Sequence, residues 1–458
     1  MPGSYSERLA TWIDEVRFND LPDYVVSDAK LRILDIVGTT LAASSFDASK
    51  SIREGALRTC AGDEATILGH GERASTAGAA LANGTMAHAL DYDDTHFGGV
   101  VHISAPTVTT ALAIGETLGA SGKDVLTAIV AGAEIGCRIG SVAPKAFHQQ
   151  GFHATSVVGV FAAAATAGKL LGLDATQLSH ALGIAGSQSS GIMQCFNDGT
   201  WTKQLHVGWA THAAIIGSNL AASGFTGPSE VLEGIQGFFE THAKPGHRFL
   251  NRMTDDLGER WEYPTTSFKP YPCGHVVHGF LDCIMQLYGK GLRAEQIKSI
   301  TCPIAEWMIP IMCEPREVKL RPASDYHAKF SFPFTIAATL TFGRLGVEAF
   351  SEQNINNPEI LALTEKIIHV PDPTATDPSR FKGWVQVETI DGRELDCVVT
   401  DNWGSKHNPM TPEQLYGKFQ ENSSLLLPDA NVQLLSDEIS YLEQIGDVSK
   451  LAELCVTS

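Results

Sequence analysis

Apolar residues recur at three- and four-residue intervals over most of the first 265 residues of the chain. This spacing is typical of helices that bury one face. Many positions in these segments are Ala or Gly, and small residues let helices approach one another closely. We therefore expect a compact helical bundle with several fully buried helices, over residues 8–17, 25–43, 105–118, 122–140, 156–171, 176–187 and 208–222.

The pattern changes after residue 263. Three prolines between residues 264 and 273 exclude a regular helix there. Helix-like residues 279–288 are followed by β-forming residues at 297–304, and alternation around Asp391-Gly392 predicts a β-hairpin over 384–399. Helical spacing returns at 411–422 and 430–444.

Together these patterns predict a mainly α protein with a large all-helical domain and a smaller α+β lid domain. Residues 1–265 are expected to form the first part of the helical domain and residues 266–400 the lid. Residues 401–458 are expected to be C-terminal helices that rejoin the helical domain.

Charge and composition exclude several kinds of partner. The 458 residues include 33 Lys and Arg against 52 Asp and Glu, a net charge of −19, which argues against nucleic acid or an anionic membrane. The nine cysteines are scattered without a CxxC pair, which disfavours a disulfide scaffold or a zinc ribbon. The N-terminus lacks a signal-peptide pattern, and Lys169 interrupts the most apolar stretch, at 156–173. We expect a soluble, cytoplasmic protein.

The first candidate site lies at residues 83–102. Three carboxylates fall within four residues, close to three histidines and a Gly98-Gly99 pair. A solvated acidic turn is the alternative, but interleaved aromatic residues and histidines would be wasteful in such a turn. The titratable residues of this segment are His88, Asp91, Asp93, Asp94, His96 and His102.

Two further candidate sites each contain a lysine. Lys203 stands between Trp201 and Leu205 at the start of an apolar helix, where a partly buried lysine is costly unless it is paired or binds an anion. A lysine that extends to solvent is the alternative. Lys269 lies in the stiff Pro-rich segment before His275 and His278, where it would present a fixed cation to an anion. The alternative is that this segment is an interdomain linker with incidental charges. Residues 324–331 give a weaker signal of the same kind.

An acidic protein with a local concentration of Lys and His suits a small anionic polycarboxylate. The cations would bind carboxylates, while a neutral His or an Asp moves a proton at a neighbouring carbon. The titratable residues at 88–102 also suit Zn²⁺ or Fe²⁺, but no HExxH motif is present and the lysines would oppose a metal ion. No GxGxxG or Walker loop is present either, so we predict neither a metal nor a cofactor. A nucleophilic Cys273 beside His275 lacks a known signature.

Several segments, in order along nearly the whole chain, resemble the MmgE/PrpD family. They are Asn83-Gly-Thr-Met-Ala-His-Ala-Leu-Asp-Tyr-Asp-Asp-Thr-His, Gly199-Thr-Trp-Thr-Lys-Gln-Leu-His-Val-Gly-Trp-Ala, Gly224-Phe-Thr-Gly-Pro, Phe268-Lys-Pro-Tyr-Pro-Cys and Asp325-Tyr-His-Ala-Lys-Phe-Ser. The family includes 2-methylcitrate dehydratase, cis-aconitate decarboxylase and iminodisuccinate epimerase. The resemblance implies a helical domain built from both ends of the chain, an α+β lid, a homodimer, and cofactor-free chemistry between the domains.

The resemblance also implies site residues. The catalytic Asp, Thr and two lysines of cis-aconitate decarboxylase match Asp91, Thr95, Lys203 and Lys269 by position. The first catalytic His of that enzyme lies near His102, with His96 as a competitor. Its last catalytic His falls on Gly274 in a gapless count. His275 is the expected substitute, and His278 matches another histidine common in the family. The acid or base is thus one of His96, His102, His275 and His278. The predicted catalytic residues are Asp91, Thr95, His102, Lys203, Lys269 and His275.

The predicted function is a cofactor-independent lyase that acts on a citrate-like or aconitate-like acid by proton transfer next to a carboxylate. Dehydration of an alkylcitrate is favoured over decarboxylation of cis-aconitate. The alternatives are an epimerase of an iminodisuccinate-like dicarboxylate and, from another class, a non-catalytic binding protein on the same fold.

Overall fold

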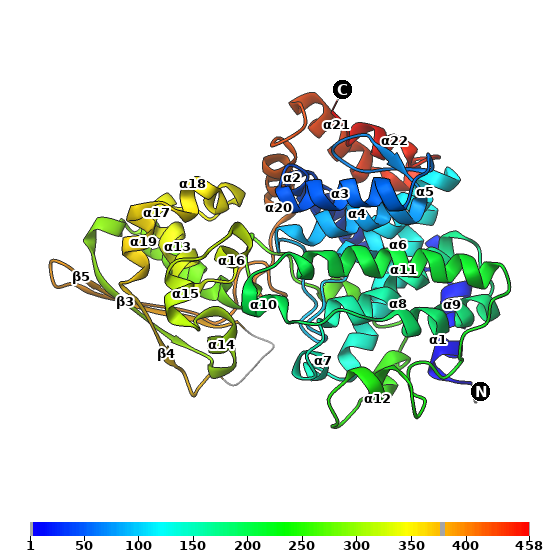
Figure 1. The fold of residues 1–458 in the computed structure, drawn as a ribbon, viewed down its shortest axis with the longest axis horizontal. Coiled ribbons are helices and arrows are strands. Elements are labelled where there is room, and N and C mark those ends of the chain that lie inside the picture. The colour runs from blue at the N-terminus through cyan, green and yellow to red at the C-terminus, as the bar shows by residue number, and fades with distance from the viewer. Residues whose placement is uncertain (1–2, 376–380, 458) are drawn as a thin grey trace.

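The computed structural model describes residues 3–375 and 381–457. Figure 1 shows two bodies side by side, a larger helical one that carries both chain ends and a smaller one that holds a sheet. The prediction of a mainly α fold with a small α+β part is confirmed. The domain ranges 1–265, 266–400 and 401–458 stay a prediction, and residues 1–2, 376–380 and 458 within them lie outside the described residues.

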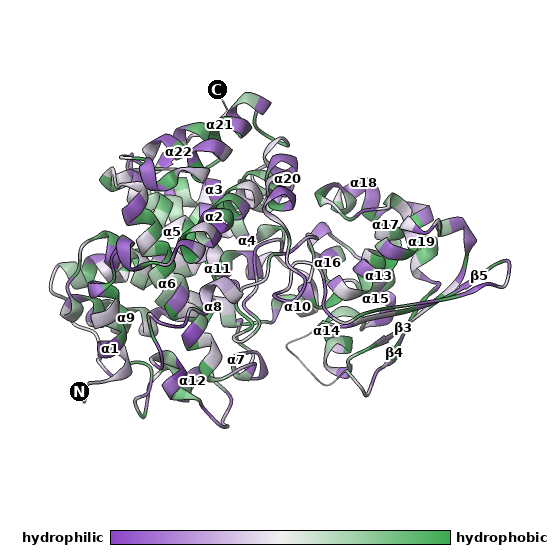
Figure 2. Ribbon diagram, turned by 180° about the vertical axis from the view of Figure 1, so that it is seen from behind, coloured by the Kyte–Doolittle hydropathy of each residue, from purple (hydrophilic) through white to green (hydrophobic). Residues whose placement is uncertain are grey.

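Helices from both ends of the chain contribute to a large apolar core of the helical body, and a second cluster of buried residues lies around α4. C-terminal α20 packs on α2. Figure 2 shows apolar and polar residues interleaved along the helices of this body. The helices of this body are α1 (Tyr5–Glu15), α2 (Asp23–Ala43), α3 (Asp47–Thr59), α4 (Thr76–Ala89), α5 (Ser104–Leu118), α6 (Gly122–Val142), α7 (Ala146–Gln149), α8 (Ala154–Leu170), α9 (Ala175–Gln188), α10 (Cys195–Asp198), α11 (Thr202–Ala222), α12 (Phe238–His242), α20 (Pro412–Ser423), α21 (Asp429–Ser440) and α22 (Ser449–Leu454).

Helix α6 is long and apolar enough to cross a membrane by length and composition alone. Its most apolar window is nevertheless entirely buried inside the protein, as in a core helix. The apolar stretch at 156–173 corresponds to the shorter α8, whose residues from Ala154 to Gly168 are buried as well. Both helices therefore serve the core of the helical body.

Helices α4 and α11 run antiparallel at very close range, because glycines face each other where they cross. A Cβ atom added to Gly84 would stand 3.0 Å from the Cα of Gly208, and one added to Gly208 would stand 2.2 Å from the carbonyl oxygen of Leu81. This contact places the end of α4 beside the beginning of α11. It thereby brings His88 to Lys203.

The smaller body is built on a mixed sheet with the strand order β4-β3-β5-β6. Strand β3 (Ile297–Ile304) pairs in parallel with β4 (Ile367–Pro371) and antiparallel with β5 (Gly383–Thr389), which forms the predicted hairpin with β6 (Glu394–Val399). Gly392 has a φ of 82°, as this tight turn requires. The helices beside the sheet are α13 (His278–Gly289), α14 (Ile309–Met312), α15 (Arg316–Leu320), α16 (Asp325–Lys329), α17 (Phe332–Phe342), α18 (Glu352–Ile355) and α19 (Pro358–Thr364).

Several elements are missing from the sequence prediction, among them α3, α17 and β4. Helix α3 is mostly polar, so its apolar spacing is weak, and β4 lies at one end of the sheet order and is only partly buried. A minor pair, β1 (Ala65–Thr66) with β2 (Arg73–Ala74), is also new.

Candidate active site

Asp91 lies at the centre of a buried charge cluster where the two bodies meet. Its Oδ1 accepts from Lys203 Nζ at 2.6 Å, and its Oδ2 accepts from Lys269 Nζ at 2.9 Å. Burial alone would raise the pKa of Asp91, but the two lysines outweigh it and hold this pKa well below its ordinary value. Two cations therefore share one carboxylate, which leaves an excess of positive charge.

Three sequence segments meet at this cluster. Asp91 follows α4 with a φ of 51°, a left-handed conformation that Asp tolerates better than most residues. Lys203 lies in the first turn of α11. The Pro-rich segment is held by two backbone hydrogen bonds between Thr95 and Ser267, each of 2.8 Å, so that Lys269 reaches both the side chain and the carbonyl oxygen of Asp91.

His88 is a neutral partner of this cluster. Its Nδ1 lies 2.8 Å from Asp93 Oδ2, and since a carboxylate oxygen accepts, the Nδ1–H is the donor. Its Nε2 then accepts from Lys203 Nζ at 2.9 Å. Burial, reinforced by Lys203, lowers the pKa of His88 well below its ordinary value, so the ring stays uncharged at neutral pH.

His102 has a free lone pair. Its Nδ1 donates to the carbonyl oxygen of Asp94 at 2.6 Å, which leaves Nε2 unprotonated in the neutral ring. Burial lowers the pKa of His102 to about 3 despite the nearby Asp93 carboxylate. The His102 side chain is nevertheless 12% exposed, whereas that of His88 is fully buried. This nitrogen therefore has the protonation state and the access that a general base needs.

Thr95 and His275 form a second pair beside Asp91. Asn402 donates from Nδ2 to His275 Nε2 at 3.2 Å, so the ring carries its hydrogen on Nδ1 and donates it to Thr95 Oγ1 at 3.0 Å. Thr95 thus accepts from His275 and keeps its own hydroxyl hydrogen for a ligand. Burial lowers the pKa of His275 well below its ordinary value. Asn402 has no counterpart in the sequence prediction, because nothing local marks it.

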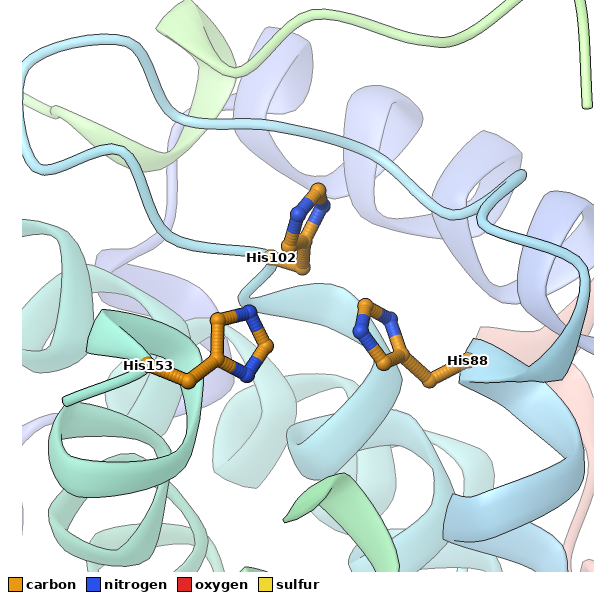
Figure 3. A group of neighbouring side chains, drawn as sticks. All are labelled: His88, His102 and His153. Atoms are coloured by element: carbon orange, nitrogen blue, oxygen red, sulfur yellow. The ribbon is translucent and has the colours of Figure 1, made fainter. Parts of the chain in front are cut away.

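His153 also reaches the site, although its sequence context gave no signal. It precedes α8, and Figure 3 shows its ring turned toward those of His88 and His102. Its Nδ1 lies 3.1 Å from Nδ1 of His206. Burial and the nearby Lys203 lower the pKa of His153 well below its ordinary value.

Helix α16 carries two buried polar groups of the smaller body whose pKa values respond to the charge of Asp91. Tyr326 Oη and Lys329 Nζ are buried and have no hydrogen-bond partner among the described residues. Burial, and after it the charge of the Asp91 carboxylate, raises the pKa of Tyr326 well above its ordinary value. Lys329 Nζ stands 3.9 Å from the centre of the Phe350 ring. The signal at 324–331, weak in the sequence, therefore marks part of the site.

Other residues of the predicted clusters lie elsewhere. His96 accepts from the backbone N–H of Gly99 and faces Glu262, so the structure brings His102 and not His96 to Thr95. Asp94 pairs with Arg32. His278 lies behind His275 and makes a 3.4 Å contact with the carbonyl oxygen of Cys273. Burial raises the pKa of the Cys273 thiol, which argues against a thiolate nucleophile.

The cluster itself is closed, and the nearest open space flanks it. A cavity of about 220 Å³ borders Asn402, the partner of His275, and Phe97, whose ring packs on His275. A larger one of about 410 Å³ lies on the other side, against Tyr92 and Pro270. Asp91, Lys203 and Lys269 are at most 3% exposed, so these three side chains are closed to solvent in this conformation.

Replacing Lys329 by Met is expected to stabilise the protein. Burial lowers the pKa of Lys329 to about 8 from 10.5, so below pH 8 the folded state carries a penalty of about 3 kcal/mol for charging it. The unfolded state binds the extra proton between these two pKa values, so the penalty fades as pH rises from 8 to 10.5. Urea unfolding of the wild type and of Lys329→Met at several pH values measures this penalty as a difference in the free energy of unfolding.

The expected result is a gain of about 3 kcal/mol at pH 7 that disappears above pH 10.5. Lys298→Met, at an exposed position on β3, serves as the control and should change little. An unchanged unfolding free energy for Lys329→Met at pH 7 would mean that Lys329 carries no such penalty.

Two protein-family models together match most of the chain. The family model of the MmgE/PrpD N-terminal domain matches residues 7–248, and that of the MmgE/PrpD C-terminal domain matches residues 271–442. The first covers the helical body up to α12, and the second covers the smaller body and most of the C-terminal helices.

Individual relatives are similar along nearly the whole chain. The cis-aconitate decarboxylase of Homo sapiens is 28% identical, over 98% of this chain and 94% of that protein. The cis-aconitate decarboxylase of Aspergillus terreus is 26% identical, over 98% of this chain and 95% of that protein. The 2-methylcitrate dehydratase of Escherichia coli (strain K12) is 24% identical, over 87% of this chain and 85% of that protein.

Proposed function

Because the chain belongs to the MmgE/PrpD family, we propose that it is a lyase acting on a small di- or tricarboxylic acid. One observation carries the proposal: two buried lysines, Lys203 and Lys269, share the single carboxylate of Asp91. Burying two cations on one anion is costly unless a further anion joins them. A substrate carboxylate supplies that charge.

The cations also supply the catalytic power. Removing a proton or CO₂ from the carbon next to a carboxylate leaves an enolate-like anion. Lys203, Lys269 and Lys329 would stabilise this charge in a site from which water is excluded, where such interactions are strong. The side chains of this chain then suffice for the proposed chemistry, without a cofactor or a metal ion.

Proton transfer is assigned to the histidines. His102 is the proposed base, since its Nε2 holds a lone pair and is partly accessible. The Thr95 hydroxyl, oriented by His275, donates a hydrogen bond to the substrate, and Asp91 keeps the two lysines in place. His275 is the proposed acid once an anionic substrate raises its pKa.

The bond that breaks decides between two reactions. The two decarboxylases compared above are more similar to this chain, over a larger share of it, than the dehydratase. This supports loss of CO₂ from cis-aconitate as the first reaction to test, although the sequence alone favours dehydration of an alkylcitrate. His275 contacts Thr95 and is the proposed substitute for the histidine that a gapless count places on Gly274, which supports decarboxylation.

A substrate panel tests the proposal. We expect turnover with cis-aconitate, citrate or an alkylcitrate, measured as CO₂ release and as a change in the absorbance of the conjugated double bond. Turnover of iminodisuccinate alone would favour the epimerase, which uses the same proton abstraction. A folded protein that binds these acids in a thermal-shift assay but converts none would be the non-catalytic alternative.

We also propose that the chain is a homodimer and works in the cytoplasm, where free thiols such as these are stable. Helix α11 carries an apolar face that solvent reaches: Trp209 is 43% exposed, Ile216 40% and Leu220 38%. An exposed apolar patch of this kind is typical of a protein interface.

Trp209→Glu is expected to shift the protein from dimer to monomer, because it places a charge in this apolar face. Light scattering after size-exclusion chromatography measures the mass. Tyr24→Glu, at another exposed aromatic residue, is the control and should leave the mass unchanged. A dimer that persists in Trp209→Glu would place the interface elsewhere.

A further inference from the structure

His88, His102 and His153 converge from three segments of the helical body (Figure 3). One ring nitrogen of each lies within 4.8 Å of those of the other two. Two ligands on one zinc ion stand roughly 3.3 Å apart, because Zn–N bonds are about 2.0–2.1 Å long. The three rings would therefore need to close by at most about 1.5 Å.

Nδ1 of each ring already has a partner. Nδ1 of His88 donates to Asp93, Nδ1 of His102 donates to the carbonyl oxygen of Asp94, and Nδ1 of His153 contacts His206. Histidines that bind metals nearly always have their second nitrogen held by a carboxylate or a carbonyl group, as Nδ1 is in His88 and His102.

A metal ion binds the lone pair of a ring nitrogen. Because Nδ1 of His88 and Nδ1 of His102 donate their hydrogens to Asp93 and Asp94, Nε2 of both rings holds such a lone pair. Three neutral imidazoles with one position left open are the donor set of several zinc sites.

We infer that His88, His102 and His153 form a binding site for a divalent transition metal ion, with Zn²⁺ as the best match. The ion is an alternative occupant of the pocket and takes no part in the proposed lyase chemistry. Because His102 is the proposed base, bound Zn²⁺ blocks turnover; that consequence rests on the proposed function, whereas metal binding does not.

Lys203 weakens this site in two ways. Its Nζ occupies the lone pair of His88 Nε2 at 2.9 Å, and its charge repels a cation at short range. Removing this lysine therefore strengthens zinc binding, while removing a histidine weakens it. Adventitious zinc on surface groups would not show these opposite effects.

The test is isothermal titration of the full-length protein with Zn²⁺, together with absorption spectra of the Co²⁺-substituted protein. We expect one Zn²⁺ per chain. His153→Gln should weaken binding at least about tenfold, as loss of a ligand does, and Lys203→Met should strengthen it by about tenfold. Cys60→Ser, which removes the partly exposed thiol, is the control and should leave binding unchanged.

The absorption spectrum of the Co²⁺-substituted protein should lack a thiolate charge-transfer band, since all three proposed ligands are histidines. His88→Gln is a second ligand variant in case His153→Gln fails to fold. Equal affinity in the wild type and a folded histidine variant, weaker binding in Lys203→Met, or no binding at micromolar Zn²⁺ would each overturn the inference. Zinc binding by a protein that turns over no acid would refute the proposed function alone.

Discussion

Lys203→Met is expected to lower kcat/KM on the best substrate of the panel by at least about a thousandfold. The substitution keeps the length and apolar stem of the side chain but removes the charge that Asp91 and His88 both contact. Because this charge lies in a buried site, its attraction to an enolate-like intermediate is far stronger than in water. The loss should appear both in kcat and in KM, since Lys203 is proposed to bind a substrate carboxylate as well as to stabilise the anion that forms during the reaction.

Steady-state kinetics and near-UV circular dichroism together check this result. Lys169→Met is the matched control, because Lys169 is also partly buried but donates to carbonyl groups of Ile13 and Asp14 at the other end of the helical body. Rates for folded Lys203→Met within tenfold of the wild type would remove Lys203 from the catalytic site.

Arg32→Leu is expected to lower the free energy of unfolding by about 3–5 kcal/mol, because it leaves a buried carboxylate without its partner. Arg32 and Asp94 are each 1% exposed and form an ion pair of 2.8 Å. The guanidinium also donates to the carbonyl oxygen of Thr266 at 2.7 Å and stacks on the ring of Phe268. The arginine thus ties α2 to the Pro-rich segment that carries Lys269.

Urea unfolding measures the loss. Adding Asp94→Asn to Arg32→Leu should restore part of it, because the second change removes the stranded charge. Arg321→Leu, in an exposed pair with Glu365, is the control and should stay within about 0.5 kcal/mol of the wild type. A loss below about 1 kcal/mol in Arg32→Leu would contradict the importance of this pair.

Local patterns predicted much of the fold. Helical spacing with Ala and Gly predicted most long helices, and the Asp391-Gly392 turn predicted the β5–β6 hairpin. Both signals depend on residues near each other in the chain, so the sequence displays them directly. The apolar spacing predicted a helix only from residue 208, because polar residues before it interrupt that spacing. Helix α11 in fact begins at Thr202.

The acidic segment shows where local patterns stop. In the sequence, Asp91, Asp93 and Asp94 form one cluster, but in the structure each carboxylate has a different partner: two lysines, a histidine and an arginine. These partners come from four separate segments of the chain. A charge count over the segment cannot separate the three, because their protonation depends on burial and on neighbours distant in sequence.

The sequence by itself determined the helical character, the hairpin, the family and the residues Asp91, Thr95, His102, Lys203, Lys269 and His275 as candidates. Only the tertiary structure decided that His102 and not His96 meets Thr95, and that His153, Tyr326, Lys329 and Asn402 join them. The physical reason is that chemical type is written at each position, whereas proximity, burial and hydrogen-bond partners arise when segments far apart in the chain pack together.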